Sequence, residues 1–338
     1  MIKYLIPFLS ALLFTSVFIF LLKFFLGNGK WAGRISARHI HHKKTFRLGG
    51  AAMILAFNLA ILFNPDLVIS PELFGAMLAS WLILAVGVWD DVREISWRSQ
   101  LLYQIAVAVI IFIFGIRIYG IRNPLAGGII SLETGIGVVI AFLISILWIV
   151  VIINSMNWLD GIDGLSGGIF FICSIAMFVL SLRPEVNQPP VAILAMILAG
   201  SALGFLFFNF YPSVIMAGTS GSMFMGFILA TLAIFAGTKV ATAVLVLSLP
   251  IIDFVWVIGE RLRHKKSIFE ADKNHLHHKL LELGWSQRKI TLGYYGITAI
   301  ITFIALNTRV VGKSIAFVLI LAIVASALFL INKKLARA

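Results

Sequence analysis

The chain alternates long, apolar, charge-free runs with short polar segments. Runs of suitable length for a membrane span lie at 4–22, 48–65, 73–89, 99–116, 134–159, 164–182, 290–308 and 314–332. The uncharged stretch 186–238 is too long for one span and is interrupted at Asn209, Tyr211 and Pro212, so it predicts two helices. A further run at 240–258 contains Pro250 and Asp253. Because a helix needs about 20 apolar residues to cross the hydrocarbon core, the pattern predicts eleven membrane-spanning helices.

The runs are continuous rather than alternating, which favours helices over β-strands in lipid. We therefore predict an all-α polytopic protein, with 1–338 as a single integral membrane domain and a basic loop at about 259–289. The first run is too long for a signal peptide and lacks a small-residue cleavage site, so we expect it to be a span. Cys173 is the single cysteine and falls within a helix, which excludes an internal disulfide.

Composition and charge agree with a membrane protein. Hydrophobic residues make up 61% and charged residues 12%, against roughly 45–50% and 25% in an average soluble domain. The net charge is +13, and with eleven spans most Lys and Arg fall on one face of the membrane. The positive-inside rule predicts that this face is cytoplasmic.

Asp90 and Asp91 follow the predicted span 73–89 directly. A helix C-terminus disfavours anions through its dipole, and adjacent carboxylates repel each other. A solvated helix end is the simpler alternative, but it leaves this cost unexplained. The pair is therefore predicted to be functional.

Two amides and two carboxylates lie at spacings of three after the span 134–159, namely Asn154, Asn157, Asp160 and Asp163. The first three share one helical face, and glycines after both aspartates allow the helix to break. Amide and carboxylate oxygens suit a hard cation. A capped helix end would explain only one aspartate and one glycine of this set.

Small residues from 217 to 222 open the next span and include Thr219. Free N–H groups at a helix N-terminus form an anion site. An ordinary Ser/Thr helix cap explains this segment equally well, so both interpretations remain open.

All histidines fall in two polar segments on the predicted cytoplasmic face, at positions 39, 41, 42, 264, 275, 277 and 278. His275, His277 and His278 lie in a basic loop and are typical of protonatable donors to phosphate. Zinc is a weaker alternative because no Cys or clearly paired Glu completes a site.

These motifs occur in the order of a known family. The aspartate pair is followed by N-x-x-N-x-x-D-G-x-D-G at 154–164, F-N-F-x-P…G-x-S-G-S at 208–222, and A-D-x-x-H-L-H-H-x-L-L-x-L-G-x-S-Q-R at 271–288, while R-x-G-G precedes them at 47–50. Over essentially its whole length the chain resembles the polyprenyl-phosphate N-acetylhexosamine-1-phosphate transferases. The WecA/TagO-like branch is the nearer one and MraY a more distant relative.

The resemblance implies transfer of a sugar-1-phosphate, commonly from UDP-GlcNAc, to undecaprenyl phosphate, with release of UMP. It implies Mg²⁺ as the cofactor, with Mn²⁺ as an alternative. The expected catalytic residues are Asp90, Asp91 and Asp160, and Asn157 is the expected metal ligand. The expected substrate contacts are Arg47, Asn154, Asp163 (uracil), Asn209 (nucleoside), His275, His277 and His278 (pyrophosphate and sugar).

The resemblance also implies a bacterial cytoplasmic membrane enzyme whose active site faces the cytoplasm and which begins a cell-envelope glycan. Its expected partners are both substrates and membrane lipid, with no nucleic acid and with a homodimer as one possible assembly. Because the lipid phosphate is largely dianionic at pH 7, we expect Asp90 and Asp91 to position metal or water rather than act as bases.

The chain departs from the family at two positions. Thr219 stands where the family has a metal-binding Asp, and Lys44, Thr45 and Phe46 replace a P-x-P segment. Since a Thr hydroxyl binds Mg²⁺ in P-loops, Thr219 is still predicted as a metal ligand. The alternative is a catalytically degenerate relative that binds lipid phosphate or nucleotide sugar. A transporter is less favoured because transporters place charged sites at mid-membrane.

Overall fold

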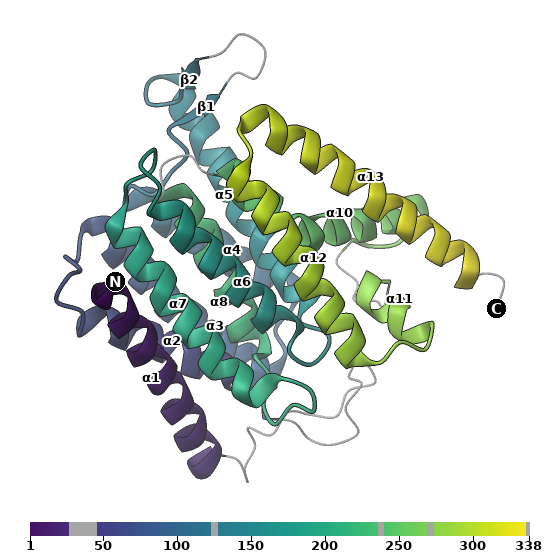
Figure 1. Cartoon of the computed structure of the whole chain (residues 1–338), viewed down its shortest axis with the longest axis horizontal. Coiled ribbons are helices and arrows are strands. Elements are labelled where there is room, and N and C mark those ends of the chain that lie inside the picture. Colours follow the sequence, from purple (N-terminus) through teal and green to yellow (C-terminus); the bar gives the residue numbers. More distant parts are fainter. Residues whose placement is uncertain (27–45, 123–127, 236–239, 269–273, 336–338) are drawn as a thin grey trace.

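The computed structural model describes residues 1–26, 46–122, 128–235, 240–268 and 274–335. The described chain forms an up-and-down bundle of helices with one small β-hairpin (Figure 1). The elements are α1 (Ile2–Leu26), α2 (Gly49–Leu62), α3 (Pro71–Arg93), α4 (Trp97–Ile113), β1 (Gly120–Arg122), β2 (Ile129–Ser131), α5 (Ile136–Leu159), α6 (Leu165–Ser181), α7 (Pro189–Asn209), α8 (Gly218–Phe235), α9 (Val240–Val246), α10 (Ser248–Arg263), α11 (Leu276–Glu282), α12 (Gln287–Asn307) and α13 (Val310–Leu335). The predicted all-α polytopic class is confirmed.

Helix length and composition agree with the predicted spans. Within the described ranges, seven helices are long and apolar enough to cross a membrane (α1, α3, α5, α7, α8, α12 and α13), and the bent pair α9 and α10 raises this to eight. The shorter apolar helices α2, α4 and α6 occupy the remaining predicted runs. Every predicted run is therefore helical, while the total of eleven spans stays a prediction.

One predicted span is broken. The run at 240–258 forms two helices, α9 and α10, which meet at Leu247 with a bend of 74°. Pro250 lies in the first turn of α10 and lacks the N–H that a continuous helix would use, and its ring clashes with the carbonyl four residues earlier. That carbonyl belongs to Val246, the last residue of α9. The run predicted as one span is therefore two helices joined at a bend.

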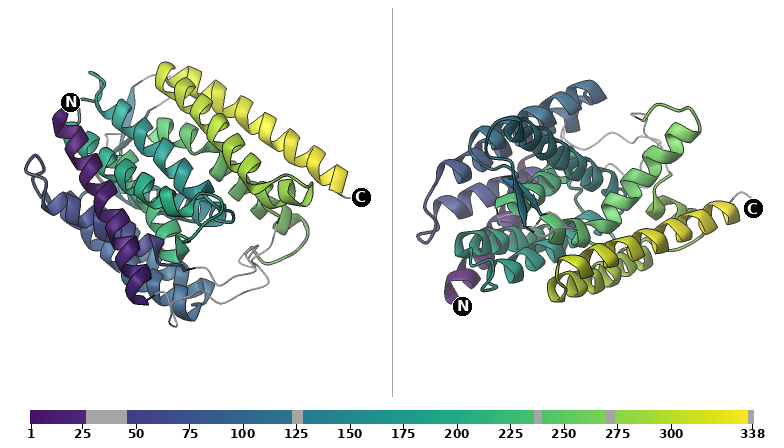
Figure 2. Two further views of the ribbon diagram at one scale, coloured as in Figure 1. Left: turned by 60° about the horizontal axis from the view of Figure 1, so that its bottom comes forward. Right: turned by 90° about the horizontal axis from the view of Figure 1, so that it is seen from above.

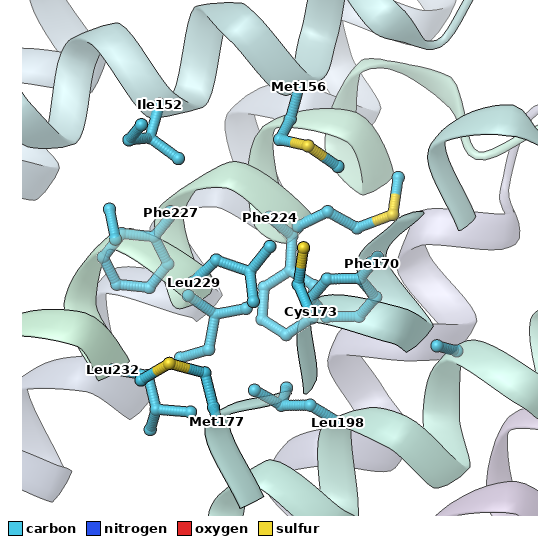
Figure 3. Close-up of a cluster of buried hydrophobic side chains, with 14 of the residues drawn as sticks. Ile152, Met156, Phe170, Cys173, Met177, Leu198, Phe224, Phe227, Leu229 and Leu232 are labelled. Atoms are coloured by element: carbon cyan, nitrogen blue, oxygen red, sulfur yellow. The ribbon is translucent and has the colours of Figure 1, made fainter. Parts of the chain in front are cut away.

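Helix α8 lies at the centre of the bundle. Of its membrane-spanning window, 83% is buried, against 11% for α13. Figure 3 shows its side chains packed against α5, α6 and α7; the residues labelled there are Ile152, Met156, Phe170, Cys173, Met177, Leu198, Phe224, Phe227, Leu229 and Leu232. Because helices in lipid associate through close packing, α8 is held from several sides at once.

Small residues allow helix backbones to approach closely. On α7, a Cβ added at Gly200 would lie 2.0 Å from the carbonyl oxygen of Phe8 on α1. The Thr15 hydroxyl donates to Ser201 Oγ over 3.0 Å beside this contact. On α2, a Cβ at Gly50 would lie 2.0 Å from the backbone nitrogen of Gly221 on α8. These glycines therefore serve packing.

The up-and-down order gathers alternate helix ends at one face of the bundle. The ends of α3, α5 and α7 and the starts of α4, α6, α8 and α12 lie there, and they carry the predicted site residues. The hairpin of β1 and β2 lies at the opposite end, at the top of Figure 1, and α11 lies to the lower right. Figure 2 shows α12 and α13 running along one side of the bundle. The hairpin was not predicted, since its strands have only three residues each.

Candidate active site

Asp91 binds the start of the central helix. Its Oδ1 accepts a hydrogen bond from the backbone nitrogen of Thr219 (2.7 Å), and its Oδ2 accepts from the nitrogen (3.2 Å) and hydroxyl (3.1 Å) of Ser220. The first N–H groups of a helix have no partner within it and form its positive end. An anion that is unfavourable at the end of α3 is therefore stabilised by the start of α8.

Asp90 is buried, and its carboxylate accepts hydrogen bonds from other donors than Asp91 does. Its Oδ1 accepts from the backbone nitrogen of Ile95 over 2.7 Å. The Gln100 amide, on α4, donates to the two carboxylate oxygens over 3.3 and 3.2 Å. The cost predicted for two adjacent carboxylates is thus offset by separate sets of donors.

Arg47 lies in an extended segment beside the start of α8. Phe46 pairs with Ile215, and the Met216 nitrogen donates to the Phe46 carbonyl over 2.8 Å. The Arg47 guanidinium lies within electrostatic reach of Asp91 and Asp160. A cavity of about 350 Å³ is lined by Arg47, Asp91, Val92, Arg93 and Glu94. Two guanidinium groups beside a carboxylate suit the binding of a phosphate, alone or together with a cation.

The row of polar residues at the end of α5 contacts three different helices. Asn154 Nδ2 donates to Gln104 Oε1 on α4 over 2.7 Å. Asn157 Oδ1 accepts from the Ser222 hydroxyl on α8 over 3.2 Å, and Asp160 accepts from the Ser166 hydroxyl on α6. Asn154 and Asn157 lie in α5, and Asp160 follows its last residue. The amide of Asn154 holds α4 and α5 together. Its contact with substrate stays a prediction.

The electrostatics of Asp160 follow from its surroundings. Burial raises the pKa of the Asp160 carboxyl to about 6, and nearby Asp163 adds to this rise. The hydrogen bond from Ser166 and the charge of Arg47 lower the pKa and oppose the shift. Asp160 is therefore mostly ionised at pH 7, and a bound cation would favour that form further.

Asp163 and Asn209 are both buried and hold the loop after α5 in place. Asn209 Oδ1 accepts from the Gly164 nitrogen (3.0 Å), and its Nδ2 donates to the Ile215 carbonyl (2.8 Å). Asp163 Oδ2 accepts from the Ser213 nitrogen over 2.9 Å. The two side chains therefore fix the loops on which the neighbouring site residues stand, and their contacts with a nucleoside stay predictions.

The histidine segment lies against the end of α5. His275 Nδ1 lies 2.8 Å from Asp253 Oδ2 on α10, and the rings of His275 and His277 stack with centroids 5.7 Å apart. His277 is fully buried, and among the described residues neither of its ring nitrogens has a hydrogen-bond partner. Burial lowers the pKa of His277 well below its ordinary value, as do His278 and His275. The neutral form of the His277 ring is therefore favoured, and its contact with substrate stays a prediction. The first histidine cluster (39, 41 and 42) lies outside the described residues.

Comparison with known proteins identifies the family of this chain. The glycosyl transferase family 4 model matches residues 73–237. A decaprenyl-phosphate N-acetylglucosaminephosphotransferase of Mycobacterium leprae is 32% identical over 302 residues, which cover 80% of this chain and 75% of the relative. The chain belongs to glycosyl transferase family 4. The resemblance stated from the motifs is confirmed.

Two further relatives of this family 4 protein bear related names. A probable undecaprenyl-phosphate N-acetylglucosaminyl 1-phosphate transferase of Bacillus subtilis is 29% identical over 311 residues, 88% of this chain and 85% of the relative. A phospho-N-acetylmuramoyl-pentapeptide-transferase of Clostridium beijerinckii is 29% identical over 280 residues, 78% and 83% of the two chains. The family match includes the aspartate pair, the 154–164 motif and the start of α8.

Oxygen atoms of a kind that binds cations lie around the first turn of α8. Asp91 bonds to the backbone of Thr219, and Ser222, which bonds to Asn157, also donates to the Gly218 carbonyl over 3.0 Å. Carboxylate, amide and hydroxyl oxygens are the ligands that fit Mg²⁺. Among the residues that the structure describes, no group of three His, Cys, Asp or Glu side chains could hold a metal.

Sequence reasoning missed several supporting residues. Asp253 was visible as a carboxylate in an apolar run, but its partner His275 lies 22 positions later. Gln287, which follows the last motif serine, accepts from the Asp163 nitrogen over 3.2 Å. Ser222 was part of a predicted segment without a role of its own. Their signal is a polar side chain within or beside an apolar helix.

Gly161→Ala is expected to displace the histidine segment. The added Cβ would lie 2.2 Å from Nε2 of His277, and overpacking of this kind costs roughly 1–3 kcal/mol. We expect a lower melting temperature and loss of activity. Gly259→Ala on α10 meets nothing within 4 Å and is the matched control. If the loss comes from the clash with the His277 ring, adding His277→Ala to Gly161→Ala should restore the melting temperature. No recovery would contradict this close contact between Gly161 and His277.

Proposed function

We propose that this family 4 enzyme transfers an N-acetylhexosamine-1-phosphate, GlcNAc-1-phosphate in the first instance, from a UDP-sugar to undecaprenyl phosphate and releases UMP. The observation that most supports this proposal is the cavity lined by Arg47, Asp91 and Arg93. It lies beside the side-chain oxygens at the start of α8 that could bind a cation. The names of the relatives from Bacillus subtilis and Mycobacterium leprae support the same reaction. It would be the first membrane step of a cell-envelope glycan.

Both proposed substrates are anions, and one of them is held in the bilayer. The reaction must therefore take place where the membrane meets water. The site residues lie at helix ends on one face of the bundle, which supports such a location. Attack of one phosphate on another is opposed by charge repulsion, which fixed cations offset. Arg47 supplies such a charge beside Asp91.

Asn157, Thr219 and Asp91 are the residues proposed to hold Mg²⁺. When bound, the cation would neutralise charge on the pyrophosphate and on the departing UMP. The contacts of Asp91 with Thr219 and Ser220 support a positioning role, and those of Asp90 with Ile95 and Gln100 support the same. A dianionic lipid phosphate needs little help from a base.

The proposal places the enzyme in a bacterial cytoplasmic membrane with the site facing the cytoplasm. The positive-inside rule supports this orientation, because Arg47, Arg93 and the basic α10–α11 segment share the face of the site. A homodimer and bound membrane lipid stay predictions.

The test uses the purified full-length protein with undecaprenyl phosphate and a panel of UDP-sugars, with and without Mg²⁺. UMP release that requires both substrates and the cation is the expected result. If no UDP-sugar yields UMP, the proposed reaction is wrong. The same panel identifies the sugar.

Thr219→Asp is expected to strengthen the metal site. A carboxylate in place of the hydroxyl should lower the Mg²⁺ concentration for half-maximal activity about tenfold, which corresponds to ~1.4 kcal/mol. Thr219→Val keeps the backbone N–H that binds Asp91 and should raise that concentration. An unchanged Mg²⁺ requirement in both variants would remove Thr219 from the metal site. An inactive wild type that Thr219→Asp activates would favour the degenerate alternative.

A further inference from the structure

A buried carboxylate outside the family motifs connects α10 to the histidine segment. Asp253 is 3% exposed. Its Oδ1 accepts from the backbone nitrogen of Leu276 over 2.8 Å, and its Oδ2 lies 2.8 Å from His275 Nδ1. Leu276 is the first residue of α11, and His275 precedes it as the helix cap without a side-chain cap bond of its own. One carboxylate therefore caps α11 and fixes the ring before it.

The His275 ring is enclosed on the side of α5 as well. Trp158 lies edge-on to it with ring centroids 5.3 Å apart. Trp158 packs on Phe254, the neighbour of Asp253, at 4.6 Å, and the Arg261 guanidinium lies 4.7 Å from the Trp158 ring centroid. Asn157, the proposed metal ligand, directly precedes Trp158 in α5, so this packing joins His275 to the same helix end.

The hydrogen bond decides which ring nitrogen is available. With Nδ1 directed at Asp253, Nε2 is the nitrogen that remains for a substrate group. A carboxylate on Nδ1 fixes the orientation of an imidazole, and an Nε2–H on such a ring can donate to a phosphate oxygen. Tyr294 on α12 lies within electrostatic reach of Asp253.

We propose that Asp253 is a positioning residue for the transfer, which holds His275 so that Nε2 donates to a phosphate group of the nucleotide sugar. This inference rests on the proposed function. Asp253 touches no substrate itself and acts through His275. The bend between α9 and α10 would then serve the site, because it brings Asp253 to the start of α11.

A double-mutant cycle tests the link to His275. Asp253→Asn keeps an acceptor for the Leu276 nitrogen but removes the charge, and we expect kcat/KM to fall about 10- to 100-fold, as for other orienting partners. If Asp253 acts through His275, then Asp253→Asn/His275→Ala should match His275→Ala within about twofold. Additive losses would overturn the proposal.

Glu260 provides the matched control. It lies on the same helix, and its Oε2 accepts from Lys279 Nζ on α11 over 3.2 Å. Glu260→Gln therefore weakens another contact between α10 and α11 without touching His275. We expect similar melting temperatures for the two single variants and normal kcat/KM for Glu260→Gln alone. Equal losses of kcat/KM in both would show that Asp253 only supports the fold.

A readout independent of activity separates this inference from the proposed function. Nitrogen-15 spectra of histidine-labelled protein, assigned with His275→Ala, should show a protonated Nδ1 at His275. That signal should change in Asp253→Asn and not in Glu260→Gln. An unchanged signal would overturn the positioning role, whereas absent UMP release with the expected spectra would overturn the reaction alone.

Discussion

Gly50→Ala is expected to prevent stable folding of the protein. The new Cβ would lie 2.0 and 2.2 Å from the backbone nitrogen and Cα of Gly221. Both are main-chain atoms of the central helix, so no side chain can turn aside, and the cost should exceed the roughly 1–3 kcal/mol of ordinary overpacking. Size-exclusion profiles and melting curves of detergent-solubilised protein would measure the loss.

The control for this variant is Gly293→Ala on α12, where an added Cβ meets nothing within 4 Å. It should give a normal elution profile and melting temperature. Normal behaviour of Gly50→Ala would instead mean that α2 can move away from α8. In that case the hydrogen bond from the Gly50 nitrogen to the Ala217 carbonyl, 2.8 Å in the structure, should be lost as well.

Asp91→Ala is expected to lose both activity and stability. The change leaves two N–H groups and a hydroxyl at the start of α8 without their acceptor, and loss of a helix cap costs about 0.5–2 kcal/mol. Asp91→Asn keeps one acceptor oxygen and should remain better folded. Activity of both variants should fall at least about 100-fold if Asp91 stabilises charge at the reacting phosphates.

Ser220→Ala is the graded comparison, because it removes one of the three donors to Asp91 and leaves its charge. It should melt slightly below the wild type and keep most of the activity. A different result would contradict the positioning role of the carboxylate pair. If Asp90→Asn and Asp91→Asn keep the metal dependence and regain activity at high pH, the aspartates act as bases.

The helices could be predicted because each apolar run has the length of a span, but their exact ends depend on tertiary partners. The third predicted span stops at 89, whereas α3 continues to Arg93 and includes both aspartates. The carboxylates remain in the helix because α8 and α4 supply donors to them. Such donors come from helices far away in sequence. Pro250 signalled a disturbance, but the bend of 74° could not be calculated from it.

For the candidate site too, the sequence predicts positions better than contacts. The motifs identify the positions, while the side-chain partners depend on which helices are neighbours. Asn209 was assigned to a nucleoside pocket, yet its amide oxygen binds Gly164 and its nitrogen binds Ile215. His277 is a predicted substrate contact, and burial lowers the pKa of its ring. Both outcomes depend on packing, which an isolated motif does not contain.

The position of α8 has a consequence for the response to bilayer thickness. A membrane that is thinner than the hydrophobic length of a protein is accommodated by helix tilt, at a cost of fractions of a kcal/mol per Å. The outer helix α13, with 11% of its spanning window buried, has little packing to oppose a tilt. The start of α8 is held by α2, α3 and α5 inside the bundle. The geometry around Asp91 should therefore persist across lipids of different chain length.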